Sequence, residues 1–277
     1  FRLSGTRLGV FPQNRTMISD RALTLAQDLV RMNTVSANSN LELIHYVRDA
    51  LRALGVACRL TFNADRTKAN LFATLGEGKP AGVILSGHTD TVPWDGQAWT
   101  VDPLSATVRD DRLFGRGSAD MKSFIALALA HAQAFLDSDA PFAIHFAFSY
   151  DEEVGCFGVR ELIADLREAG IRPLACIIGE PTGMVPAIAH KGVYRYRCCV
   201  RGKEAHSSLT PSSVNAIEMA ARVQYMLSRG LTRTGVPLPI IQSPSFSWDE
   251  SQRDCPVSGS PSRFSVWVSL CCNLGVR

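Results

Sequence analysis

The stretch Val83-Ile-Leu-Ser-Gly-His-Thr-Asp90 joins a short apolar run to a histidine and an aspartate. An apolar run of this length is typical of a buried strand in a sheet that is covered on both faces. The run therefore predicts an interior strand, with His88 and Asp90 just beyond its carboxyl end. In open α/β sheets, ligands bind at that end of the strands.

Two other apolar runs along the chain also end on acidic residues. The run that ends at residue 150 is followed by three consecutive acids, and the run through residue 178 is followed by Gly-Glu. A further acid lies where a glycine-rich loop enters an alanine- and leucine-rich helical pattern. These acids are Asp151, Glu152, Glu153, Glu180 and Asp120. One histidine and several carboxylates offer the N and O donors of a hard-to-borderline dication and no thiolate, so the sequence predicts a metal site.

Each of these residues has an ordinary structural explanation when it is taken alone. A single His-x-Asp is more often a loop histidine near a solvated acid. The acids at residues 151–153 would suit the first turn of a helix, and Glu180, before Pro181, could be a turn acid. Three such coincidences at three strand ends favour the metal site over the separate explanations.

Periodic patterns predict alternating strands and helices along the chain. Helices are predicted from Ser19, from near Asn40, and over residues 121–136, 159–168 and 214–227. Strands are predicted over residues 56–62, 70–75, 83–86, 142–149, 174–178 and 193–201. This alternation predicts an α/β sheet, with a smaller α/β unit after about residue 185. Residues 76–82 lack the Lys-Ser/Thr ending of a phosphate loop and are predicted to be a hairpin turn.

The composition excludes several classes of protein. Lys and Arg number 29 and Asp and Glu 26, and a net charge of +3 is too small to predict a nucleic-acid or membrane partner. The uncharged helical pattern at residues 123–136 is too short to span a bilayer, and residues 1–16 lack an apolar signal core. The eight cysteines form no C-x-x-C pair and indicate reduced thiols in a cytoplasmic protein. Cys176, inside an apolar run, is expected to be buried.

Five motifs follow one another in the order of a known family. They are G-H-T-D-T-V-P (87–93), G-R-G-S-A-D-M-K (115–122), D-E-E-V-G (151–155), G-E-P-T (179–182) and G-K-E-A-H-S-S (202–208). This set resembles the M20 family of dinuclear zinc amidohydrolases and peptidases. A finer string, G-E-P-T-G-M (179–184), A-H-K-G (189–192), A-H-S-S (205–208) and V-N-A-I (214–217), resembles the acetylornithine deacetylases within it.

The resemblance covers residues 17 to about 237 and implies both a fold and a metal centre. The implied fold is a zinc-peptidase-like catalytic α/β domain with a mixed sheet flanked by helices, interrupted by an α+β lid that mediates dimerisation. His88 and Glu180 would bind one metal and Glu153 the other, with Asp120 bridging both. The implied cofactor is Zn²⁺, two per subunit, with Co²⁺ as a possible replacement.

The resemblance also implies roles for three residues that bind no metal. Asp90 would orient the imidazole of His88, and Glu152 would be the general base. His206 would reach into the partner subunit's site and stabilise the oxyanion. The implied reaction is hydrolysis of N2-acetyl-L-ornithine to L-ornithine and acetate, in arginine biosynthesis, by a homodimer. The alternatives are a sister activity, such as succinyl-diaminopimelate desuccinylase or aminoacylase, and an inactive fragment.

The composition changes sharply near the carboxyl end. All thirty alanines fall within residues 17–237, whereas residues 238–277 contain nine serines, four prolines, three cysteines and two tryptophans. The family's final histidine ligand lies far downstream, and this chain has no histidine after His206. We therefore expect residues 238–277 to be an out-of-frame tail without the strands that complete the lid, and residues 1–16 a non-native leader. Residues 17–185 would be catalytic, and residues 186–237 part of the lid.

Overall fold

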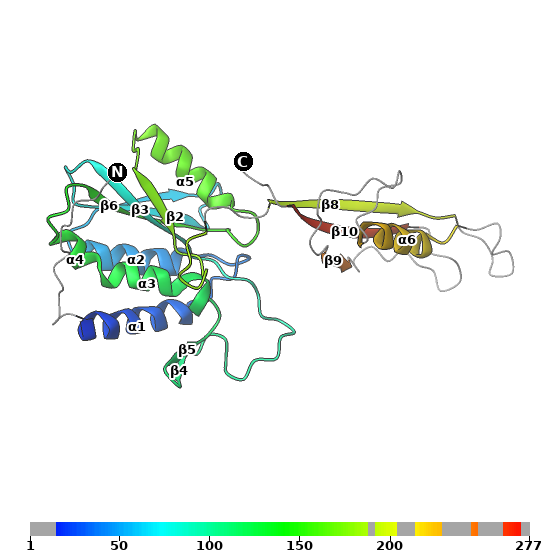
Figure 1. Ribbon diagram of the computed structural model, residues 1–277, viewed down its shortest axis with the longest axis horizontal. Helices are drawn as coiled ribbons and strands as arrows, with labels where there is room; N and C mark the ends of the chain where they lie inside the picture. Colours follow the sequence, from blue (N-terminus) through cyan, green and yellow to red (C-terminus); the bar gives the residue numbers. More distant parts are fainter. Residues whose placement is uncertain (1–14, 188–191, 204–213, 229–244, 249–262, 273–277) are drawn as a thin grey trace. The chain divides into compact units, whose positions relative to one another are not determined.

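The computed structural model describes residues 15–187, 192–203, 214–228, 245–248 and 263–272 (Figure 1). The chain divides into two compact units, Phe1–Met184 and Val185–Arg277. Within the described residues, no helix combines the length and the apolar character needed to cross a membrane.

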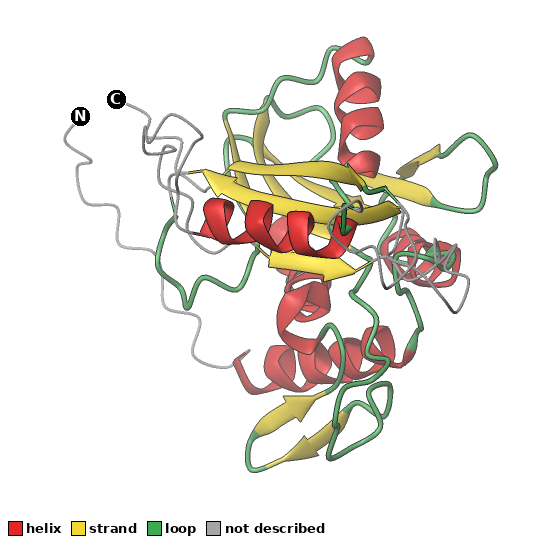
Figure 2. Cartoon of the chain, turned by 90° about the vertical axis from the view of Figure 1, so that its right-hand side faces the viewer, coloured by secondary structure: helices red, strands yellow, loops and turns green. Residues whose placement is uncertain are grey.

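The first unit is built on a five-stranded sheet in the order β1-β2-β6-β3-β7. Its strands are β1 (Cys58–Phe62), β2 (Ala69–Leu75), β3 (Ala81–His88), β6 (Ala143–Ser149) and β7 (Ala175–Ile178). β3 runs parallel to both β6 and β7, whereas β2 is antiparallel to β1 and β6. A hairpin of β4 (Thr107–Arg109) and β5 (Arg112–Phe114) lies apart from this sheet (Figure 2). The predicted α/β class with a mixed sheet flanked by helices is confirmed.

Helices cover both faces of this sheet. They are α1 (Arg15–Arg31), α2 (Leu41–Arg52), α3 (Ser123–Ala130), α4 (Ala132–Leu136) and α5 (Phe157–Glu168). The larger core packs α1, α2 and α3 against one face, and α5 covers the other face (Figure 1). In α2, Leu43, Val47 and Leu51 are fully buried, as their helical spacing predicts.

The loop of residues 76–82 is not the hairpin that its glycines suggest. It joins β2 to β3, and these strands are not neighbours, because β6 lies between them and pairs with both. A tight turn does form at its start, where the Lys79 N–H donates to the Gly76 carbonyl at 3.2 Å. Gly76 has a φ of +89°, a conformation that favours glycine. The turn was predicted correctly, but the pairing of the strands that it joins was wrong.

The strand predicted over residues 174–178 forms as β7, but its predicted burial is wrong. β7 lies at the edge of the sheet, next to β3. Ile177 and Ile178 are 53% and 63% exposed, and Cys176 is an exposed residue rather than a buried one. An apolar run indicates a buried strand only where neighbouring elements cover it.

The helix predicted over residues 121–136 is shorter and interrupted. It begins at Ser123, after the turn η1 (Ser118–Lys122), and breaks at His131 into α3 and α4. At the break, Nδ1 of His131 lies 2.8 Å from the carbonyl of Leu127. The His131 N–H also donates to this carbonyl, at 3.1 Å, so the last helical hydrogen bond of α3 is kept at the break.

The described residues of the second unit form a three-stranded antiparallel sheet in the order β8-β10-β9 and one helix. Its elements are β8 (Gly192–Arg201), α6 (Ala216–Ser228), β9 (Ser245–Trp248) and β10 (Arg263–Cys272). β9 and β10 fall within residues 238–277, where the strands that complete the lid were expected to be missing. The alternation of Phe264, Val266, Val268 and Leu270 with polar or aromatic residues is itself a strand pattern. This pattern was overlooked because residues 238–277 are rich in serine.

A buried histidine of β6 is expected to make the stability of the first unit dependent on pH. His145 is 3% exposed, stacks on Phe72, and lies 3.0 Å from Oγ1 of Thr74 through Nδ1. Its Nε2 is buried without a hydrogen-bond partner in the described part of the chain. Burial lowers the pKa of His145, because the charged imidazolium is poorly solvated there.

We expect the replacement His145→Phe to remove part of the chain's acid sensitivity. Below the ordinary histidine pKa of about 6.5, the unfolded chain takes up a proton that the folded chain resists, so stability falls as the pH falls. Urea unfolding of both proteins at about pH 7.5 and about pH 5 measures this. The wild-type free energy of unfolding should decrease more on acidification than that of the variant. Equal decreases would contradict the assignment to His145, since every other titrating group is shared.

Candidate metal centre

Three parallel strands bring the predicted site residues to one edge of the sheet. His88 is the last residue of β3, Glu152 and Glu153 lie in the loop after β6, and Glu180 follows β7. Because β6, β3 and β7 are parallel neighbours, their carboxyl ends meet at the same edge. Asp120 reaches this edge from η1.

These side chains form two groups that share His88. In one, ligand atoms of His88, Asp120 and Glu180 lie within 4.8 Å of one another, and in the other the same holds for His88, Glu152 and Glu153. Nε2 of His88 is 2.9 Å from Oδ1 of Asp120 and 3.7 Å from Oε1 of Glu180. The imidazole is buried, whereas the Asp120 and Glu180 side chains are 48% and 37% exposed. The centre therefore has a buried base and an open side.

Two glycines allow the helical segment that carries Asp120 to pack against the strand ends. A Cβ at Gly87 would lie 3.0 Å from the Met121 side chain. A Cβ at Gly179 would lie 2.1 Å from the ring of Phe124, a separation that real Cβ atoms do not show. Because Gly87 and Gly179 have no Cβ, η1 and α3 can pack closely against the ends of β3 and β7. This approach brings Asp120 within reach of His88.

The environment of His88 selects the nitrogen that faces the carboxylates. Nδ1 donates to the main-chain carbonyl of Asp90 at 2.9 Å and lies 3.6 Å from the Asp90 carboxylate. With Nδ1 held this way, Nε2 faces Asp120 and Glu180. Once it has lost its proton, Nε2 would offer its lone pair to a metal ion bound there. Burial alone would lower the pKa of His88. The hydrogen bond and charge of Asp90, with the charges of Glu180 and Asp120, outweigh burial and raise that pKa to about 9.

The carboxylates of the centre repel one another. Burial and the negative charge of Asp120 raise the pKa of Glu153 to about 7, although His88 opposes the shift. Burial also raises the pKa of Glu180, and the charges of Asp120 and Glu152 add to it against His88. A divalent cation among these groups would offset this repulsion. The N and O donors fit a dication such as Zn²⁺ or Co²⁺.

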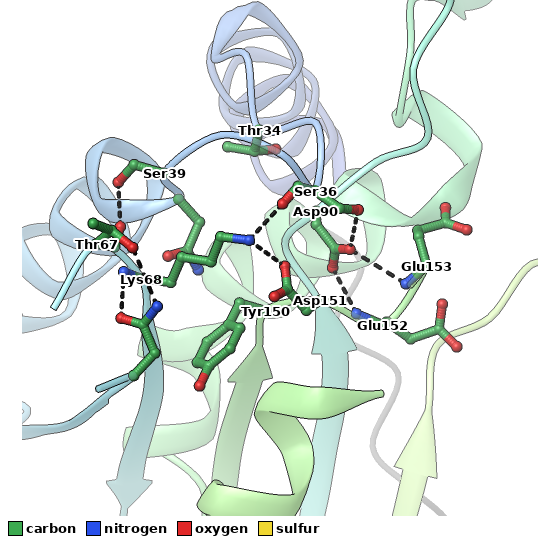
Figure 3. A network of polar contacts seen from close by, with 12 residues as sticks. Thr34, Ser36, Ser39, Thr67, Lys68, Asp90, Tyr150, Asp151, Glu152 and Glu153 are labelled. Atoms are coloured by element: carbon green, nitrogen blue, oxygen red, sulfur yellow. Dashed lines mark hydrogen bonds and ion pairs between the residues drawn. The ribbon is translucent and has the colours of Figure 1, made fainter. Parts of the chain in front are cut away.

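The carboxylate of Asp90 holds the loop that carries the two glutamates (Figure 3). Its Oδ1 accepts the Glu152 N–H at 3.0 Å, and its Oδ2 accepts the Glu153 N–H at 3.2 Å. The Ser36 hydroxyl donates to Oδ2 at 2.6 Å. Burial would raise the pKa of Asp90, but the nearby His88 and the hydrogen bonds from Ser36 and Glu152 lower it. Asp90 is therefore an ionised acceptor that touches both His88 and the glutamate loop.

Sequence reasoning missed the supporting residues around this centre. Ser36 and Lys68 lie in segments without a motif, and Cys156 places its Sγ 3.5 Å from Oε1 of Glu152. No pattern in the sequence singled them out. The last predicted site residue, His206, lies outside the described residues.

Comparison with known proteins matches a family and a set of curated relatives. The model of "Peptidase family M20/M25/M40" matches residues 84–251. Acetylornithine deacetylase of Aliivibrio salmonicida is 34% identical over 207 residues, which cover 73% of this chain and 53% of that protein. Acetylornithine deacetylase of Proteus mirabilis is 34% identical over 237 residues, 82% of this chain and 60% of that protein. The chain thus spans 53–60% of the length of these two relatives.

Solved structures share the fold at low identity. An M20 family metallo-carboxypeptidase from Sulfolobus solfataricus matches with a TM-score of 0.70 and 16% identity, covering 93% of this chain and 72% of that chain. Human carnosine dipeptidase 1 matches with a TM-score of 0.66 and 19% identity, covering 96% and 72%. At such identities the likeness shows the fold alone.

Proposed function

This chain belongs to peptidase family M20, and we propose that it hydrolyses N2-acetyl-L-ornithine to L-ornithine and acetate with the help of two zinc ions. The observation that carries the proposal is the meeting of His88, Asp120 and Glu180 with Glu152 and Glu153 at one sheet edge. The names of the two curated relatives support the substrate.

The family resemblance implies how the metals would be held. His88 and Glu180 would hold one ion, Glu153 the other, and Asp120 would contact both. When bound, such ions polarise the scissile carbonyl and lower the pKa of a water molecule. Asp90 would keep the His88 imidazole in the orientation that its main-chain carbonyl already imposes.

Glu152 is the residue that we propose to move the proton. Asp90 binds the main-chain N–H of Glu152 and leaves its carboxylate among the donor groups. The carboxylate would take the proton of the attacking water and then deliver it to the leaving α-amine. His206 would stabilise the negative charge that develops on the carbonyl oxygen.

The family resemblance extends the proposal beyond this centre. It supports a cytoplasmic homodimer acting in arginine biosynthesis on a small N-acyl amino acid. It also supports a division into a catalytic part, residues 17–185, and a partial lid, residues 186–237. In the dimer, His206 would act in the site of the partner subunit.

A metal analysis with two substrates tests the proposed function. We expect about two zinc ions per chain and faster turnover of N-acetylornithine than of N-succinyl-diaminopimelate. Faster turnover of the succinyl substrate would instead support a desuccinylase, and preference for other N-acyl amino acids an aminoacylase. One zinc ion or none, without turnover of any of these substrates, would support an inactive fragment.

A further inference from the structure

Lys68 lies at the junction of three chain segments beside the metal centre. It immediately precedes β2, and its ammonium donates to the main-chain carbonyl of Ser36 and to the carboxylate of Asp151 (Figure 3). Nζ of Lys68 is 2.6 Å from Oδ1 of Asp151, and the two side chains are only 14% and 16% exposed. The ion pair is therefore shielded from water, and the Lys68 ammonium has two acceptors rather than one.

Each of the two segments that supply the acceptors of Lys68 is also hydrogen-bonded to Asp90. The Ser36 hydroxyl donates to the Asp90 carboxylate, and the Ser36 N–H donates to the carbonyl of Thr91 at 3.1 Å. On the other side, Asp151 precedes the two glutamates whose N–H groups donate to Asp90. Lys68 and Asp90 therefore fix the same loop from two sides, Lys68 through a side chain and Asp90 through the main chain.

The conformation of Asp151 needs such support. Its φ is +55°, in the left-handed region, which is uncommon outside glycine although aspartate and asparagine enter it more readily than other residues. Its carbonyl accepts the Phe157 N–H at 3.1 Å, where α5 begins. Without the ammonium, the Asp151 carboxylate would be mostly buried and unpaired, so the side chain would turn towards water. The main chain of the loop would then lose its left-handed turn.

We propose that Lys68 is a positioning residue, which through Asp151 and Ser36 aims Glu152 and Glu153 at the metal centre. The inference rests on the proposed function, because it assigns to these glutamates the task of holding a metal ion and moving a proton. Residues that orient metal ligands typically contribute tenfold to a hundredfold to metal affinity. A loop displaced by about 1 Å would also lower the rate of the proposed reaction by about a hundredfold.

The direction in which metal affinity changes distinguishes a positioning role of Lys68 from a purely electrostatic one. If Lys68 acted only through its charge, removing the cation would strengthen binding of a metal ion. Removing the negative charge of Asp151 would weaken it. If the ion pair positions the loop, Lys68→Met and Asp151→Asn both weaken binding, and the double variant loses no more than either alone.

The experiment is a titration of the metal-free chain with Co²⁺, followed by visible absorbance. We expect Lys68→Met and Asp151→Asn each to weaken Co²⁺ binding by about tenfold or more, and Lys68→Arg to retain most of the affinity. Asn accepts the left-handed conformation readily, so Asp151→Asn tests the proposal even if Lys68→Met does not fold. The matched control is Arg59→Met, which breaks an ion pair between β1 and Asp165 of α5. It should lower thermal stability without changing Co²⁺ affinity.

The outcomes distinguish a failure of the positioning role from a failure of the proposed function. Unchanged Co²⁺ affinity in both variants, or tighter binding in Lys68→Met, overturns the positioning role. A wild-type chain that binds Co²⁺ but hydrolyses none of the acyl substrates overturns the proposed function, while the affinities of the variants still decide the role of Lys68. A wild-type chain that binds no Co²⁺ overturns both.

Discussion

Replacing Glu152 by glutamine is expected to lower kcat for N-acetylornithine by about a thousandfold, since a general base contributes a hundredfold to ten-thousandfold. Glutamine has the size of glutamate but cannot accept the proton of the attacking water. The main-chain hydrogen bond from residue 152 to Asp90 does not depend on the side chain. The loop should therefore keep its conformation, and the metal content should stay that of the wild type.

Kinetics and zinc analysis on the same preparation check this expectation. The matched control is Glu168→Gln, which makes the same chemical change at an exposed position on α5. It should alter neither kcat nor zinc content. If Glu152→Gln keeps kcat within tenfold of the wild type, another group moves the proton. If its zinc content falls, Glu152 is a metal ligand, as its place beside His88 and Glu153 would also permit.

The sequence predicts the donor groups because they follow apolar runs. His88, Glu153 and Glu180 each come just after such a run, and parallel neighbouring strands end at one edge of a sheet. Which glutamate binds a metal and which moves a proton does not follow from this rule. Those roles came from the family resemblance, and the geometry groups Glu152 and Glu153 equally with His88.

The supporting network could not be predicted, because its contacts join distant positions. Ser36 and Asp90 are 54 residues apart in the chain, and Lys68 and Asp151 are 83 apart. A serine and a lysine in loops are common, and nothing in their spacing indicates a shared partner.

The errors in the predicted fold also arise because contacts between distant parts of the chain cannot be read from local patterns. The pattern of β7 is apolar, but its burial depends on which strands lie beside it. The glycines after β2 predict a turn, but they do not reveal that β6 enters the sheet between β2 and β3. Local patterns predict the elements, whereas neighbours in space decide their exposure and order.

Replacing Asp120 by alanine is expected to have the largest effect on metal binding, a loss of at least about a hundredfold, because even residues that only orient ligands contribute up to that much. Oδ1 of Asp120 is 2.9 Å from Nε2 of His88. Its charge also acts on both Glu153 and Glu180. A ligand shared by two ions should affect both when it is lost, whereas Glu180→Ala should weaken only the ion held by His88.

Calorimetric titration with Zn²⁺, together with turnover of N-acetylornithine, measures the difference between the two variants. The Asp120 side chain is 48% exposed, so the metal-free variant should unfold at the wild-type temperature. Glu77→Ala, which removes an exposed acid from the loop after β2, serves as the control and should bind Zn²⁺ normally. Two weakened binding steps in Asp120→Ala and one in Glu180→Ala are the expected pattern. A single weakened step in Asp120→Ala would contradict the proposal that Asp120 contacts both ions. One of the two ions would then bind equally well without the Asp120 carboxylate.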